Sequence, residues 1–224
     1  GAYPAGGSGH FAQVLADAIE ARGGEVRLRT GVTRVLQEDG VAQGVVVRDH
    51  KGNESTIRAT ALVCNADPGA LARDLLDDSP QRQTMLRQFG DMVPSCSAVG
   101  MHIGLRGAVD VPPIVHVKDG DVHTEVIFTT VVDPSAAPEG YATLDLFQLT
   151  TPDESATWFP PEAAADLKTF RRSQPYLDRK AEASASMLDV ARRIVPDLDG
   201  RIVYQSDASP VTFHRYGWTR HGAI

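Results

Sequence analysis

The chain has 224 residues, of which 42% are hydrophobic, with 22 basic and 29 acidic side chains and a net charge of -7. This length and composition support a buried core in one large domain or two small ones. The acidic balance, without any block of Lys and Arg, argues against a nucleic-acid partner. No apolar run approaches the roughly 18 residues that span a bilayer, and no signal pattern opens the chain, so the sequence predicts a cytoplasmic protein.

The first predicted element is a helix over residues 9–22 that follows a glycine-rich turn. Phe11, Leu15 and Ile19 recur at helical spacing, and Ser8 is a candidate N-cap. Short runs of β-forming residues, separated by turn residues, then predict strands at 25–36, 41–48, 55–58 and 61–65.

A change of pattern at residues 67–69 predicts a domain boundary near residue 68. The elements expected beyond it are helices at 71–76 and 81–89, strands at 96–105, 114–118, 125–132 and 141–150, helices over 161–195 that break at Pro175, and a last strand at 201–205 followed by a helical turn. The turn residues between the four central strands favour a mixed, largely antiparallel sheet covered by helices.

The turn Gly7-Ser8-Gly9 fits the glycine pattern of a dinucleotide-binding loop. Such a loop needs a buried strand directly before it and an acidic residue about 20 positions later. Only six residues precede Gly7, and residues 27–29 carry arginines where the acid is expected. A glycine-rich turn that caps a helix is therefore preferred to a pyrophosphate site.

Two pairs of histidines have a functional and a structural interpretation. His116 and His123 flank residues 119–121, where a metal site would need further ligands, so a solvated hairpin is preferred and no metal is expected. His214 and His221 flank an aromatic turn and have the residue type of a general acid-base pair. A surface or domain-contact role is preferred for them.

The basic helix and the two cysteines are interpreted in the same way. The helix that carries Arg171, Arg172, Arg179 and Lys180 predicts a solvated face, with contact to an anionic membrane as the alternative. Cys64 and Cys96 lie far apart in apolar runs, which predicts buried thiols rather than a disulfide or a metal pair.

Two strands present faces of unusual composition. In the strand at 96–105, Gly100, His102 and Gly104 alternate with larger apolar residues, so either a helix packs closely on this small face or a ligand approaches it. In the strand at 141–150, Tyr141, Asp145 and Phe147 share one face with Thr143 and Leu149. That face either lines an apolar cavity with Asp145 as its polar contact or is a solvent-facing edge.

Several sequence segments along the chain resemble those of one family of flavoproteins. They are "YPAGGSGHFAQVLADAIEARGGEVRLRTGVTRVLQEDGVAQGVVV", "IRATALVCNADPGALARDLL", "IFTTVVDPSAAPEGYATLDLF", "YLDRKAEASASMLDVARRIVPDL" and "SPVTFHRYGWTRHGAI", in this order. Together they are similar to phytoene-desaturase-like flavoproteins, the carotenoid desaturase and isomerase relatives within the amine-oxidase-like FAD superfamily. The resemblance covers almost the whole chain.

The resemblance implies an α+β (α/β) fold that combines part of a Rossmann-like FAD domain with a substrate domain. Residues 1–68 and 206–224 would form the partial FAD domain, and residues 69–205 the substrate domain. The glycine-rich segments that close on the FAD at both ends of such flavoproteins have no match here. The chain is therefore expected to be an internal portion that is inactive alone and retains no FAD, within a parent that binds FAD and sits in the cytoplasm, where a peripheral membrane contact is left open.

Motif matching to the family places six residues beside the FAD: Gly6, Gly7, Val32, Asn65, Ala66 and Asp67. The function implied is hydride transfer between the flavin and an elongated apolar, polyene- or isoprenoid-like substrate, which Tyr141, Asp145 and Phe147 would contact. Neither the catalytic residues nor the oligomeric state are indicated. The alternative from another class is a non-catalytic module that binds an apolar ligand or acts as a scaffold, and flanking sequence would distinguish the two.

Overall fold

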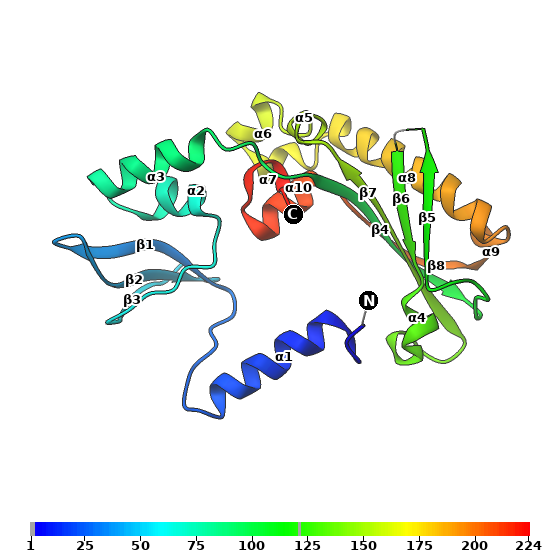
Figure 1. The fold of residues 1–224 in the computed structure, drawn as a ribbon, viewed down its shortest axis with the longest axis horizontal. Coiled ribbons are helices and arrows are strands. Elements are labelled where there is room, and N and C mark those ends of the chain that lie inside the picture. Colours follow the sequence, from blue (N-terminus) through cyan, green and yellow to red (C-terminus); the bar gives the residue numbers. More distant parts are fainter. Residues whose placement is uncertain (1–2, 121) are drawn as a thin grey trace. The chain divides into compact units, whose positions relative to one another are not determined.

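The strands of the chain form two separate antiparallel sheets (Figure 1). The computed structural model describes residues 3–120 and 122–224. Contacts divide the chain into two units: one contains residues up to 17, 94–216 and 220–224, and the other contains 18–93 and 217–219. Residues 25–65 and 96–150 thus belong to different sheets, as expected, and the mixed α and β fold with antiparallel sheets is confirmed.

The smaller unit holds a three-stranded sheet with the order β1-β2-β3. Its elements are β1 (Thr30–Glu38), β2 (Val41–Asp49), β3 (Glu54–Arg58), α2 (Pro68–Ala70), the π-helix η1 (Leu71–Leu75) and α3 (Pro80–Gly90). Asp39 and Gly40 turn β1 into β2 with positive φ angles of 50° and 78°. The helix α1 (Gly7–Glu20) precedes the sheet, and it starts two residues earlier than the sequence predicts.

The strand predicted at residues 61–65 is wrong. These residues have no strand structure, because no described strand pairs with them beyond β3. Val63 is 99% exposed and Cys64 is exposed, so the expectation of a buried thiol fails at that position, whereas Cys96 is half-buried. The strand predicted at 25–36 begins only at Thr30.

The larger unit holds a five-stranded sheet with the order β5-β6-β7-β4-β8. Its strands are β4 (Ser97–Arg106), β5 (Ile114–Asp119), β6 (Val122–Ile127), β7 (Tyr141–Thr150) and β8 (Ile202–Ala208). The helices around it are α4 (Thr129–Val132), η2 (Pro134–Ala136), α5 (Pro152–Ala156), α6 (Pro161–Ala165), α7 (Leu167–Phe170), α8 (Gln174–Ile194), α9 (Leu198–Arg201), α10 (Pro210–Gly217) and η3 (Arg220–Gly222). Residues 129–132, predicted as strand, are the helix α4.

The core of this unit lies on one face of the five-stranded sheet. Alternate residues of β4 and β7 point into it, as the period of a strand requires: Met101, Ile103, Leu105, Leu144 and Leu146 are all buried. The helix α8 packs on the same face through Met187, Val190 and Ala191 (Figure 1). Pro175 lies in the first turn of α8, where its missing N–H costs nothing, so the expected break falls before the helix.

The opposite face of the same sheet is only partly covered. We call it the open face and define it by the outward residues of its central strands: Gly100, His102, Gly104, Tyr141, Thr143, Asp145, Phe147 and Leu149, with Glu125 and Ile127 of β6 beside them. Each is half-buried or exposed except Gly100, which is buried. This alternation with the core residues is the pattern that the sequence predicts for β7.

The two units do not divide where the sequence predicts a boundary. Residues 69–93 lie in the unit of the three-stranded sheet, and residues 206–216 stay with the five-stranded sheet because β8 pairs with β4 as far as Ala208. A division by internal contacts does not identify which residues bind FAD and which bind substrate, so the assignment of FAD-binding and substrate-binding domains stays a prediction. In residues 3–120 and 122–224, no helix combines the length and apolar character needed to cross a membrane.

Candidate functional site

A histidine and an aspartate face each other on the open face of the five-stranded sheet. The antiparallel register places His102 of β4 directly opposite Asp145 of β7. The imidazole Nδ1 lies 2.6 Å from Asp145 Oδ1, and Thr129 Oγ1 donates to Asp145 Oδ2 over 3.2 Å. Both carboxylate oxygens are therefore engaged, and the pair is held at the start of α4.

The pair is accessible from outside the sheet. The side chain of His102 is 54% exposed, whereas that of Asp145 is 22% exposed. With Nδ1 bound to the carboxylate, a neutral imidazole keeps Nε2 as its proton acceptor. In the described part of the chain Nε2 has no hydrogen-bond partner. An imidazole oriented by a carboxylate, with its second nitrogen free, is an arrangement that can take up or release a proton.

An aromatic ring borders the pair. The rings of His102 and Phe147 meet edge to face with 6.0 Å between their centroids. Gly100 makes room for this ring, because a Cβ there would lie 3.2 Å from Phe147. A Cβ at Gly104 would lie 3.2 Å from the Cβ of Tyr204. The small residues of β4 thus accommodate side chains of the two neighbouring strands rather than a packed helix.

The structure locates the three residues predicted to contact substrate. Tyr141, Asp145 and Phe147 all lie on the open face, as the alternation predicts. β7 is not an edge strand, because it pairs with β6 on one side and β4 on the other, but its open face is partly exposed, so the solvent-facing alternative stays open beside the cavity. A contact with substrate stays a prediction. The sequence analysis did not identify His102 as the partner of Asp145, although the alternation in both strands places the two residues on outward-facing positions.

Gly6 and Gly7 form a left-handed turn at the start of α1. Their φ angles of 79° and 80° favour glycine, and Gly6 N–H donates to Asp133 Oδ2 over 3.0 Å. Hydrogen bonds from the Ser135 side chain, from Gly6 and from the Ser135 backbone lower the pKa of Asp133. The short helix α4 therefore lies between two residues that the sequence analysis singled out. At its start Thr129 donates to Asp145, and directly after its end Asp133 accepts from Gly6 N–H.

The other residues predicted at the FAD lie in the smaller unit. Val32 is half-buried in β1, and the pairing of β1 with β2 shifts directly after it, between Val32 and Arg34. Because β1 is an edge strand of its sheet, the backbone groups on its outer side pair with no strand among the described residues. Asn65 and Ala66 are exposed in a non-strand segment, and Asp67 caps α2 by accepting from Ala70 N–H over 2.8 Å. Whether they meet FAD stays a prediction.

The histidines of the aromatic turn pack on one phenylalanine. The ring centroids of His214 and His221 lie 5.3 Å and 5.5 Å from that of Phe159. Burial lowers the pKa of His221, and the charges of Arg220 and His214 lower it further. His221 is therefore neutral at pH 7, and both rings take part in packing.

The lowered pKa of His221 predicts that acid destabilises the fold. The unfolded chain binds a proton at the ordinary histidine pKa, near 6.5, whereas the folded chain resists it. Stability is then complete above that pKa and falls as the pH drops toward the folded value. His221→Asn keeps a residue that tolerates the left-handed φ of 53°. This substitution should reduce the change of the urea-unfolding midpoint between about pH 5 and pH 8. His50→Asn, in an exposed turn, should leave that pH dependence unchanged.

The β5–β6 hairpin carries a second, looser histidine–carboxylate pair. His116 Nε2 lies 3.9 Å from Glu125 Oε1, and both side chains are well exposed. Asp121, part of the metal site considered from the sequence, lies outside the described residues. Over residues 3–120 and 122–224, no group of three or more His, Cys, Asp or Glu side chains is placed to hold a metal.

Comparison with known proteins identifies the family. The sequence pattern of "Flavin containing amine oxidoreductase" matches residues 2–169. The chain belongs to this family. As an amine-oxidase-like flavoprotein sequence it is related to carotenoid desaturases and isomerases: it is 27% identical to "Prolycopene isomerase, chloroplastic" of Daucus carota, over 96% of this chain and 34% of the carrot protein.

Two further comparisons concern a curated relative and a solved structure. The chain is 26% identical to "Phytoene desaturase (neurosporene-forming)" of Cereibacter sphaeroides, over 94% of this chain and 41% of that protein. A solved oxidoreductase from Methanosarcina mazei matches 92% of this chain and 43% of its own length, with a TM-score of 0.57 and 18% identity, which supports the fold alone. The chain thus spans roughly a third to two fifths of the length of the curated relatives named here.

Proposed function

We propose that the chain is part of an FAD-dependent oxidoreductase that transfers a hydride between the flavin and an elongated, mainly apolar polyene or isoprenoid. The observation that carries this proposal is the open face. It joins the aromatic ring of Phe147 to a single oriented polar pair, His102 and Asp145. A few placed polar groups in an apolar surface are typical of sites for apolar ligands.

In this proposal the flavin supplies hydride acceptance, and the chain supplies orientation and a place for the proton. Formation of a double bond removes a hydride from one carbon and a proton from its neighbour. His102 Nε2 accepts that proton while Asp145 holds Nδ1–H and stabilises the resulting charge. Tyr141 and Phe147 lie along the same strand as Asp145 and would keep an extended substrate parallel to β7.

The chain's own contacts suit the edges of FAD rather than its phosphates. Gly6 and Gly7 permit close backbone approach, and β1 near Val32 offers edge backbone groups. None of the six residues expected at the FAD carries a positive charge. In this proposal residues 1–68 and 206–224 belong to a partial Rossmann-like FAD domain, and residues 69–205 belong to the substrate domain.

Flavin retention distinguishes this function from a non-catalytic binding module. The 224-residue chain should lose FAD on desalting, because none of the six residues expected at the FAD carries a positive charge that could neutralise its two phosphates. A longer protein that contains this chain should stay yellow with one FAD per chain. A colourless longer protein that FAD cannot reconstitute would favour the binding module.

A further inference from the structure

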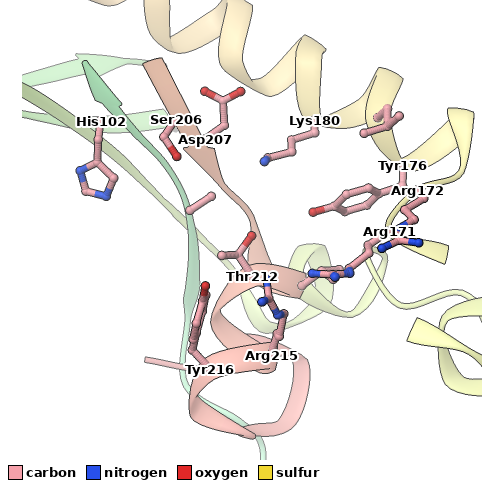
Figure 2. Close-up of a pocket in the computed structure, with 13 residues that line it drawn as sticks. His102, Arg171, Arg172, Tyr176, Lys180, Ser206, Asp207, Thr212, Arg215 and Tyr216 are labelled. Atoms are coloured by element: carbon pink, nitrogen blue, oxygen red, sulfur yellow. The ribbon is translucent and has the colours of Figure 1, made fainter. Parts of the chain in front are cut away.

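A cavity of about 430 Å³ lies within the five-stranded unit, between α8, β8 and α10 (Figure 2). Arg171 and Arg172 border it just before α8, and Lys180 borders it from the second turn of that helix. Arg215 and Tyr216 border it from α10, and Ser206 and Asp207 from β8. Four side chains that are cationic at neutral pH therefore surround one cavity in a chain whose net charge is negative.

These four cations form no ion pair with any acidic side chain that the structure describes. In the described residues, no ion pair involves Arg171, Arg172, Lys180 or Arg215. The arginines near the other end of α8 differ: Arg192 pairs with Asp189 and Asp199, Arg193 with Asp119, and Arg201 with Asp197. The arginines near that end of α8 are thus paired with carboxylates, whereas the four cations at the cavity are not.

The sequence predicted that the basic residues before and along α8 form a solvated face, and the structure separates them. Arg179 packs over the Trp158 ring with 4.2 Å to its centroid and donates to Thr157. Arg171 and Lys180 are instead half-buried at the cavity. Like charges gathered around a partly desolvated space repel each other, and an anion between them removes that cost.

One acidic side chain reduces the positive potential without cancelling it. Asp207 borders the cavity, and its Oδ1 accepts from Gln205 Nε2 over 3.2 Å. Four positive charges against one negative charge leave a strong excess, while Tyr216 and Thr212 add hydroxyl donors. The Arg215 guanidinium lies over the Tyr216 ring at 4.8 Å, which orients its donors.

We propose that this cavity binds a phosphate-bearing group with more than one negative charge. Arginine forks match the oxygens of phosphate, and four cations suit a diphosphate or dianion better than a single carboxylate. The four cations take no part in the proposed function and none of the six residues expected at the FAD lines the cavity, although His102, the proton acceptor of the proposed function, also borders it. The phosphate belongs either to a soluble ester or to an anionic lipid headgroup, since both present the same oxygens.

Calorimetric titration of the 224-residue chain with inorganic pyrophosphate, without flavin or substrate, tests the proposal. The double variant Arg171→Gln with Arg215→Gln should weaken binding by about tenfold for each charge removed. The matched control, Arg192→Gln with Arg193→Gln, removes the same charge from the other end of α8 and should leave the affinity unchanged. Both pairs are largely exposed or half-buried, and circular dichroism checks that each variant is folded.

Sedimentation with vesicles identifies the source of the phosphate. Phosphatidylcholine vesicles that contain phosphatidic acid should pull down the wild-type chain, but not the pocket variant, if the ligand is a lipid headgroup. Binding of free pyrophosphate without sedimentation assigns the site to a soluble phosphate ester. The proposal is overturned if the wild-type chain binds neither probe, or if the control variant loses as much affinity as the pocket variant. Because no turnover is measured, these results are independent of the proposed function.

Discussion

Asp145→Asn in the flavin-loaded enzyme should lower the turnover of an apolar substrate by about 10²–10⁴-fold, the usual contribution of a positioned acid-base group. The amide keeps the size of the side chain but loses the charge that orients His102 across 2.6 Å. Nε2 is then no longer held as the proton acceptor, and the charge formed on the imidazole is not stabilised. Steady-state kinetics at saturating substrate measure the effect, which should fall on kcat more than on KM.

Glu125→Gln is the matched control for this substitution. Glu125 faces His116 on the same open face, but His116 Nε2 and Glu125 Oε1 are 3.9 Å apart, too far for a hydrogen bond. Turnover of this variant should stay within about threefold of wild type, as exposed ion pairs contribute little. Equal turnover of the Asp145→Asn, Phe147→Ala and wild-type enzymes with every polyene tested would show that the open face does not contact the substrate.

Gly222→Ala should destabilise the chain by about 2–5 kcal/mol, which combines a left-handed backbone with overpacking. Gly222 has a φ of 70°, and an added Cβ would overlap the carbonyl oxygen of Pro210, a backbone atom that cannot rotate away. The same residue accepts a buried hydrogen bond from Ser97 Oγ over 2.6 Å at the start of β4. The substitution therefore disturbs the segment that joins η3 to the five-stranded sheet.

Gly140→Ala separates the two causes of this loss. Gly140 also has a positive φ, of 81°, but an added Cβ would meet no atom within 4 Å. Its cost should be limited to the backbone term of about 1–2 kcal/mol. Urea unfolding of both variants gives the comparison, and equal losses for the two would show that the contact between Gly222 and Pro210 does not constrain the fold.

The sequence predicted the parts of the fold that depend on local pattern. The alternation in residues 141–150 gave the core and open faces of β7 correctly, because side-chain period is a local property. The apolar run at 61–65 was misassigned, because a strand needs a partner and none of the described strands supplies one. The sequence also led to the prediction that Pro175 interrupts a helix, whereas Pro175 lies in the first turn of α8, a position that proline favours.

The candidate sites depend on what the fold brings together. His102 and Asp145 are 43 residues apart, and only the register of β4 against β7 makes them a pair. The cationic cavity likewise joins residues 171–172 and Lys180 to Arg215 through the placement of α8 and α10. The sequence singled out the basic residues of the first group, but nothing in their spacing indicates that Arg215 completes the cavity.

The most direct test of the central claim is the absorbance of the flavin after anaerobic mixing with a polyene. A protein that contains this chain, loaded with FAD, is mixed with phytoene and a panel of related apolar polyenes. We predict that at least one polyene bleaches the oxidised flavin and that Asp145→Asn slows the bleaching, whereas Glu125→Gln does not. Flavin that stays oxidised with every polyene, although the polyenes bind, would contradict hydride transfer at this site.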